Sequence, residues 1–149
     1  MPDRLRILVL HGPNLDLLGR REPHIYGTMT LADINQLLRA LADELGVDLE
    51  IVQSNHEGAL LDALHERIDT VQGCLLNPAG LTQYSVGLHD TIKAMPSPVV
   101  EVHLTNLHAR EAWRRHSLVG QAATATVQGL GWRSYTAALR TLAEQLREA

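Results

Sequence analysis

Two ionisable residues inside an apolar run have the types and spacing for proton transfer. Glu101 and His103 lie two apart in residues 99–103, and residues two apart on a strand point to the same face. A carboxylate beside an imidazole fixes its tautomer and favours its protonated form, which predicts a general acid at His103. The alternative is a buried polar pair that serves packing alone, which is disfavoured because burying such a pair among valines is costly.

A base is predicted in residues 17–29, a segment without helical or strand periodicity. A connection of this length in a compact domain is typical of a lid over a site. It contains Arg21 and Tyr26, and a nearby guanidinium stabilises the phenolate form of a tyrosine. Such a phenolate can remove a proton next to a carbonyl. The alternative is an exposed loop whose side chains only cover the surface.

Further cations follow the predicted acid. Arg110 and Arg114 are four residues apart, so they share one face if this segment is helical, and two guanidiniums suit an anionic, hydroxylated substrate. The alternative is a charged, solvated helix. Lys93 is the only lysine and stands near the end of a predicted helix, where we expect it to be solvated. Imine chemistry, which needs a shielded lysine, is therefore disfavoured.

The elements that must position these groups alternate between strand and helix. Five strands alternating with helices predict a flavodoxin-like α/β three-layer sandwich, with a five-stranded parallel sheet in the order 2-1-3-4-5 and one domain over residues 1–149. Thr30 is predicted to cap the first helix and Gly46 to end it. The predicted strands are 7–10, 49–52, 71–76, 99–103 and 122–127, and the predicted helices are 31–45, 59–68, 85–94 and 135–146.

Three of these strands run directly into polar and turn-forming residues, at 11–14, 77–80 and 103–106. Ligands of doubly wound sheets bind beyond the carboxyl ends of the strands, near the point where strand order reverses. We therefore expect these three segments to meet at one pocket. Any one of them alone would be explained by ordinary turn formation, because Asn, Gly and Pro favour turns.

Composition excludes several other classes of protein. The 149 residues carry a net charge of −4, which favours neither nucleic acid nor an anionic membrane as a partner. Cys74 is the single cysteine, which excludes an internal disulfide framework and suits a reducing compartment. The first apolar run is too short for a signal peptide, so a cytoplasmic protein is expected. No metal-ligand pair of histidines or glycine-rich phosphate loop is present, and no cofactor is expected.

Taken in order, the motifs of this chain resemble those of the type II 3-dehydroquinate dehydratases, over nearly its whole length. The matching segments are 11–15, 17–23, 26–27, 53–58, 77–82, 101–103 and 106–111. The resemblance implies a cofactor-free lyase that converts 3-dehydroquinate to 3-dehydroshikimate and water by anti elimination through an enolate. It also implies a dodecamer of four trimers, working in aromatic biosynthesis or in quinate breakdown.

The resemblance further assigns roles to individual residues. It implies that Tyr26 is the base and that His103, oriented by Glu101, is the acid. Asn14 would stabilise the enolate through a bound water, and Arg21, with help from Arg110, would close the lid and favour the phenolate. The implied substrate contacts are Asn77, Gln83, Asp90, Leu104, Thr105, Arg110 and Arg114, with Asp90 reaching the site of a neighbouring subunit.

Four positions depart from the family pattern. Gln83 replaces a usual substrate-binding histidine, His89 replaces an arginine beside Asp90, and Asp16 and Tyr84 are also unusual. Glutamine still forms hydrogen bonds but carries no charge, which predicts weaker substrate binding or a shifted pH profile.

Two other functions remain open at this stage. One is a non-catalytic or altered-specificity paralogue that binds a related polyhydroxy carboxylic acid, although such a protein has no use for both a base and an acid. The other is a flavodoxin-like electron carrier, which is disfavoured because the segment after the first strand lacks a phosphate cradle and aromatic residues are few.

Overall fold

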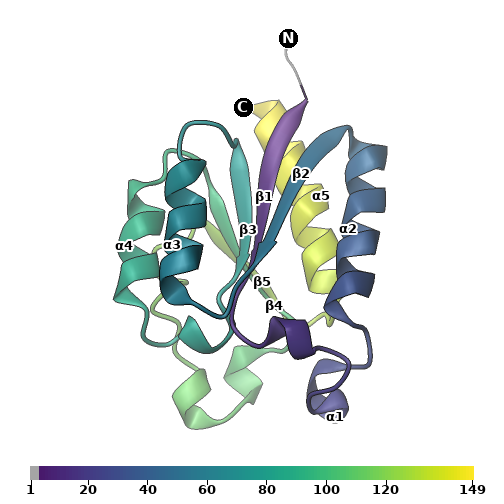
Figure 1. The fold of residues 1–149 in the computed structure, drawn as a ribbon, viewed down its shortest axis with the longest axis vertical. Coiled ribbons are helices and arrows are strands. Elements are labelled where there is room, and N and C mark those ends of the chain that lie inside the picture. Colours follow the sequence, from purple (N-terminus) through teal and green to yellow (C-terminus); the bar gives the residue numbers. More distant parts are fainter. Residues whose placement is uncertain (1–3) are drawn as a thin grey trace.

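The computed structural model describes residues 4–149 and places a parallel sheet between two layers of helices (Figure 1). The sheet has five strands in the order β2-β1-β3-β4-β5, and every neighbouring pair is parallel. The strands are β1 (Leu5–His11), β2 (Val47–Gln53), β3 (Gly73–Asn77), β4 (Val99–His103) and β5 (Ala125–Gln128). The helices are α1 (Pro23–Tyr26), α2 (Leu31–Leu45), α3 (Glu57–Glu66), α4 (Val86–Ala94) and α5 (Arg133–Glu148). The predicted flavodoxin-like order is confirmed.

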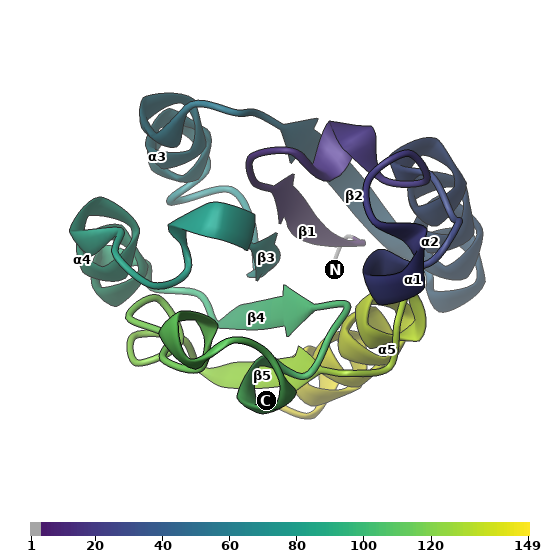
Figure 2. The same ribbon diagram turned by 90° about the horizontal axis from the view of Figure 1, so that it is seen from below.

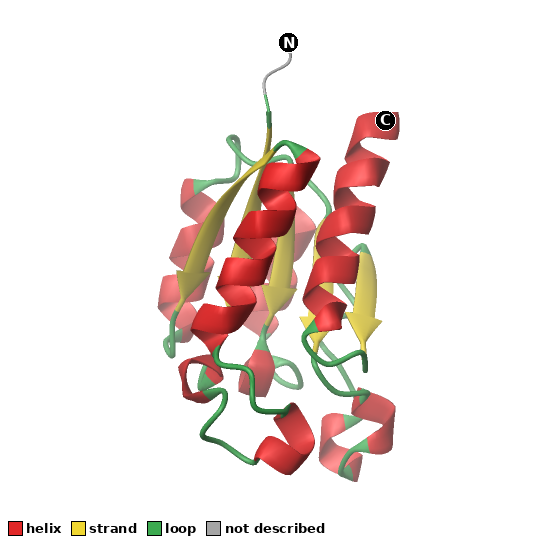
Figure 3. Ribbon diagram, turned by 90° about the vertical axis from the view of Figure 1, so that its right-hand side faces the viewer, coloured by secondary structure: helices red, strands yellow, loops and turns green. Residues whose placement is uncertain are grey.

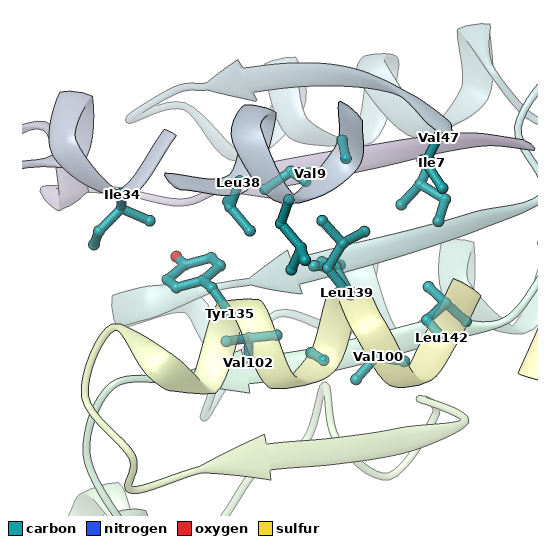
Figure 4. Close-up of a cluster of buried hydrophobic side chains, with 14 of the residues drawn as sticks. Ile7, Val9, Ile34, Leu38, Val47, Val100, Val102, Tyr135, Leu139 and Leu142 are labelled. Carbon is teal, nitrogen blue, oxygen red and sulfur yellow. The ribbon is translucent and has the colours of Figure 1, made fainter. Parts of the chain in front are cut away.

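The core is split by the sheet into two apolar clusters. Ile7 and Val9 of β1 pack into a cluster with α2 and α5 (Figure 4), whereas Leu8 and Leu10 pack into the cluster under α3 and α4. Alternate residues of a strand face opposite sides of the sheet, so a continuous apolar run fits a central strand that is covered on both faces.

The ends of the longest internal helix follow from its sequence. Thr30 accepts a hydrogen bond from the Asp33 backbone N–H, and the Asp33 carboxylate accepts one from the Thr30 backbone N–H. This capping box satisfies amide groups that the first turn leaves free. At the other end Gly46 takes a left-handed conformation, which is favourable for glycine. Both predicted ends of α2 are confirmed.

The sequence misplaced several other boundaries. β5 begins at Ala125 rather than at residue 122, because residues 122 and 123 donate their backbone N–H groups to a preceding turn. β3 begins at Gly73, because Val71 is held in the turn after α3. Residues 17–29 were expected to be irregular, yet they contain α1, a single turn that starts at Pro23. A helix this short has no periodicity for a sequence to display.

All five strands point to one end of the sheet, where the connecting segments gather (Figures 2 and 3). Four 3-10 helices lie in these connections, at Leu15–Leu17, Ala79–Leu81, Leu107–Ala109 and Ala112–Arg114. This arrangement brings short segments from distant parts of the sequence over the carboxyl ends of β1, β3 and β4. Within residues 4–149 no helix combines the length and apolarity needed to span a bilayer.

Candidate active site

A cavity of about 260 Å³ lies at the carboxyl ends of β1, β3 and β4. Its walls include ten of the twelve residues that the sequence analysis assigned to the site: Asn14, Arg21, Tyr26, Asn77, Gln83, His103, Leu104, Thr105, Arg110 and Arg114. The other two do not line it. Glu101 is buried behind His103, and Asp90 is exposed on α4.

The hydroxyl group of Tyr26 is held by a cation from a distant part of the chain. Arg110 Nη2 donates a hydrogen bond to Tyr26 Oη over 3.1 Å. Arg21 stacks over the same ring, with its guanidinium carbon 4.8 Å from the ring centre, and Arg110 lies 5.2 Å from that centre. Sequence proximity had suggested Arg21 as the main partner of the tyrosine, whereas Arg110 makes the contact with its oxygen. Two guanidinium groups therefore lie against one phenol.

Arg110 contacts several side chains on this side of the cavity. Its Nη1 donates to Thr105 Oγ1 over 3.1 Å, and its Nε donates to Glu111 over 3.1 Å. Burial alone would lower the pKa of Arg110, but its contacts with Tyr26 and Glu111 outweigh burial and raise it. The guanidinium is therefore a fixed charge that contacts Tyr26, Thr105 and Glu111.

The predicted acid pair is buried, and hydrogen bonds support its carboxylate. Glu101 is 1% exposed and His103 is 5% exposed, and His103 Nε2 lies 3.3 Å from Glu101 Oε2. Ser117 and Thr126 donate their hydroxyl groups to the same carboxylate over 2.5 and 3.2 Å. Burial raises the pKa of Glu101, but the contacts with His103, Ser117 and Thr126 outweigh it and hold the pKa below its ordinary value. The carboxylate is thus kept charged beside the imidazole.

Gly120 packs closely against this carboxylate and against the hydroxyl of Ser117. A Cβ atom at Gly120 would lie 2.7 Å from Glu101 Oε1 and 2.9 Å from Ser117 Oγ. A side chain at position 120 would displace the carboxylate or the hydroxyl that bonds it.

The loop after β1 places Asn14 at the mouth of the cavity. Asn14 has a left-handed backbone (φ 68°), and its N–H donates to Asn55 Oδ1 over 2.9 Å. Behind it, the Gly12 N–H donates to the Asn77 carbonyl over 2.8 Å, and a Cβ at Gly12 would lie 2.7 Å from the Pro78 oxygen. The backbone after β1 therefore contacts the backbone after β3 directly, and this contact requires glycine at position 12.

The remaining wall carries amide and guanidinium groups. Gln83 Nε2 donates to the Arg114 carbonyl over 3.2 Å, which joins the segment after β3 to the segment after β4. Arg114 Nε donates a hydrogen bond to Glu111 Oε2 over 2.9 Å, and the Arg114 guanidinium carbon lies 4.1 Å from the centre of the Trp113 ring. Glutamine in place of histidine thus lines the cavity and also bridges two of its loops.

Sequence reasoning missed several residues that support or line the site. Ser117 and Thr126 hold Glu101, Asn55 holds the Asn14 backbone, and Trp113 forms part of the wall. Serine, threonine and asparagine are common in turns, and neither type nor spacing distinguished these positions. Only the contacts reveal them.

Two chemical possibilities can be compared with this geometry. The only lysine of the chain, Lys93, is exposed near the end of α4 and does not line the cavity, so the site lacks an amine for imine formation. Among the residues that the structure describes, no group of three or more histidine, cysteine, aspartate or glutamate side chains is arranged to hold a metal ion. The arrangement can transfer protons, with a phenol at one side and an imidazole at the other.

Comparison with known proteins relates this geometry to a family. The family model described as "Dehydroquinase class II" matches residues 5–143. The 3-dehydroquinate dehydratase of Desulforudis audaxviator is 54% identical over 140 residues, covering 94% of this chain and 93% of that protein.

Solved structures agree with the sequence match. The type II dehydroquinase from Propionibacterium acnes superposes with a TM-score of 0.90 at 40% identity, covering 95% of this chain and 99% of that one. The type II dehydroquinase from Butyrivibrio crossotus gives a TM-score of 0.91 at 31% identity, covering 93% and 97%.

Proposed function

The chain belongs to the class II dehydroquinases, and on that premise we propose that it converts 3-dehydroquinate to 3-dehydroshikimate and water. The observation that carries the proposal is the meeting, in one cavity, of Tyr26 held by Arg110 and His103 backed by Glu101. We further propose that residues 1–149 act as a single catalytic domain.

Tyr26 is the general base in this proposal. Its phenolate removes a proton from the carbon next to the ketone, and the electron pair of that C–H bond moves into an enolate. The hydrogen bond from Arg110 and the stacked Arg21 support this role because both cations stabilise a negative oxygen. Arg21, on the segment before α1, also closes the cavity over the substrate.

Asn14 and a bound water stabilise the enolate oxygen until the second step. The position of Asn14 at the mouth of the cavity, fixed through Asn55, supports this role. A donor that is already oriented before charge develops does not have to reorganise during the reaction.

His103 is the general acid. The enolate expels the hydroxyl group while the imidazolium donates a proton to it, so that water leaves and the conjugated enone forms. Glu101 holds the ring and stabilises its positive charge, and this role is supported by the lowered pKa of Glu101. Tyr26 then returns its proton to solvent and His103 is reprotonated, which restores the starting state.

Substrate recognition uses the rest of the wall. We assign the carboxylate of the substrate to Leu104 and Thr105, and its hydroxyl groups to Asn77, Gln83, Arg110 and Arg114. The guanidinium groups complement the negative charge of the substrate. No cofactor takes part in this scheme, because proton transfer and electrostatic stabilisation account for each step.

Assembly is a separate proposal. We propose a dodecamer of four trimers in which Asp90 reaches the site of a neighbouring subunit, supported by its exposure on α4. His89 Nδ1 donates a hydrogen bond to the Leu118 carbonyl oxygen over 2.7 Å. This ring is therefore held within its own subunit beside Asp90. Light scattering of the purified protein tests the assembly. We also propose a cytoplasmic location, without nucleic acid or membrane partners. The proposed role is in either aromatic biosynthesis or quinate breakdown.

Ultraviolet absorbance of the conjugated enone carboxylate tests the reaction. We expect absorbance to rise when the protein is mixed with 3-dehydroquinate. The rate should be unchanged for enzyme that was treated with borohydride in the presence of substrate, freed of both, and assayed with fresh substrate. Binding of 3-dehydroquinate by folded protein without any rise would favour the non-catalytic paralogue instead. Loss of activity after borohydride would contradict the lysine-free route.

Proton exchange separates the two steps. With His103→Ala, we expect slow elimination, while deuterium from solvent continues to enter the carbon next to the ketone. Exchange that stops together with elimination would contradict an enolate formed before the hydroxyl leaves.

A further inference from the structure

A network of hydrogen bonds runs behind the cavity from Asn77 to Tyr135 and His11, and the proposed reaction does not use the last two. Asn77 Nδ2 donates to Tyr135 Oη over 3.0 Å, and Tyr135 Oη lies 3.0 Å from His11 Nδ1. His11 Nε2 lies 2.8 Å from Asn35 Oδ1. At the other end, Asn77 Oδ1 accepts from the Ala79 N–H over 3.1 Å. The network crosses from α2 through β1 and α5 to the end of β3.

The donor and the acceptor of each hydrogen bond in this network follow from the groups at its two ends. The Ala79 backbone N–H can only donate, so it faces Asn77 Oδ1, and Asn77 Nδ2 must face Tyr135. Tyr135 accepts there, and at the other end His11 Nε2 faces the Asn35 oxygen and must carry the ring proton, so Nδ1 accepts the proton of Tyr135. His11 therefore carries its proton on Nε2 and donates it to the Asn35 oxygen.

Burial keeps the His11 ring neutral and the Tyr135 hydroxyl group protonated. His11 and Tyr135 are 0% exposed, and Tyr135 extends from α5 into the apolar cluster beneath α2 (Figure 4). Burial lowers the pKa of His11 to about 4, against the weaker effect of Asn35, so the ring is neutral at pH 7. Burial likewise raises the pKa of Tyr135, which keeps its proton on the oxygen. A hydroxyl group in such a cluster is costly unless it is bonded, and here it is bonded twice.

We propose that Tyr135 and His11 are positioning residues that fix the side-chain amide of Asn77 in the cavity. With Nδ2 bonded to Tyr135 and Oδ1 bonded to Ala79, Asn77 keeps one N–H and one oxygen lone pair in set directions for a hydroxyl of the substrate. The inference rests on the proposed function in one respect, namely that Asn77 contacts the substrate.

Tyr135→Phe tests the proposal most simply, because it removes one oxygen and keeps the ring. We expect KM for 3-dehydroquinate to rise roughly threefold to tenfold with kcat changed less than about twofold, as for a lost orienting bond that acts equally on bound substrate and transition state. Leu142→Val is the matched control, since Leu142 lies further along α5 in the same cluster but outside the network. It should lower Tm without changing KM.

Two substitutions at one position separate orientation from packing. The Oδ1 atom of asparagine can take the place of imidazole Nδ1, so His11→Asn should still accept from Tyr135 and keep KM near the wild-type value. His11→Leu removes the acceptor and should raise KM as Tyr135→Phe does. If the asparagine and leucine variants raised KM equally, or if Tyr135→Phe left KM at the control value, the proposal would be overturned.

A double-mutant cycle locates the effect at Asn77. In an Asn77→Ala background, Tyr135→Phe should change KM by less than about 1.5-fold, because the group it orients is gone. A full, independent increase would contradict positioning through Asn77. Wild-type turnover in the same assay reports on the proposed reaction separately. The side-chain ¹⁵N resonance of Asn77 gives a reading without turnover: it should shift in Tyr135→Phe and His11→Leu and stay in place in His11→Asn and Leu142→Val.

Discussion

Acidification from pH 7 to pH 5 should weaken the fold through His11, and His11→Asn should remove this effect. Burial lowers the pKa of His11 from 6.5 to about 4. The unfolded chain therefore takes up a proton near pH 6.5, whereas the folded protein does so only near pH 4. Between these values the unfolded state binds more protons, so stability is full above pH 6.5 and is lost as pH falls toward 4.

The size of the effect follows from the separation of the two values. For pKa values of about 6.5 and 4, proton linkage destabilises the fold by about 0.2 kcal/mol at pH 7 and about 2 kcal/mol at pH 5. The loss on acidification is thus about 2 kcal/mol, a large part of the stability of an ordinary domain. Glu101, whose pKa is lowered, adds a loss of the same sign at lower pH, but it does so in wild type and variant alike.

Urea denaturation at pH 7 and pH 5, at one protein concentration, measures this difference. The free energy of unfolding of wild type should fall about 2 kcal/mol more than that of His11→Asn. His116→Asn removes an exposed histidine and should behave as wild type does. Equal losses in wild type and His11→Asn would refute the conclusion that the folded state holds this histidine neutral.

Three further predictions concern the acid pair, the substrate wall and the thiol. Ser117→Ala removes a hydroxyl that stabilises the Glu101 carboxylate, so the pKa of Glu101 should rise and kcat should fall roughly threefold to tenfold; an unchanged kcat would contradict the role of Ser117. Gln83→His should lower KM or shift the pH profile, and steady-state kinetics that leave both untouched would contradict a specificity role for Gln83. Burial raises the pKa of the Cys74 thiol to about 12, so it should resist an aromatic disulfide reagent at pH 8 until urea unfolds the protein; rapid reaction in the native state would contradict its burial.

The fold was largely predictable because its signals are local. Thr30 and Gly46 mark the ends of α2 through their own backbone bonds, and apolar runs mark the strands that the two clusters cover. The four residues of α1 were missed, since one turn has no period. The family resemblance and the strand order are both confirmed.

The sequence predicted which residues line the cavity better than it predicted which of them contact one another. The residues at the strand ends do meet in one cavity, as parallel strands require. Sequence proximity favoured Arg21 as the partner of Tyr26, and only the family resemblance pointed to Arg110, which is 84 positions away and contacts the oxygen. The network from Asn35 to Asn77 also joins four separate elements. Contacts between distant residues depend on packing, which composition and periodicity do not encode.

The most direct test of the proposed chemistry compares wild type with Tyr26→Phe in two measurements on one sample, turnover of 3-dehydroquinate and calorimetric binding of the same compound. Loss of a general base predicts a fall in kcat of roughly 100- to 10,000-fold, while Kd stays within about threefold of wild type. Turnover that remains near the wild-type rate in Tyr26→Phe would contradict the assignment of Tyr26 as the base.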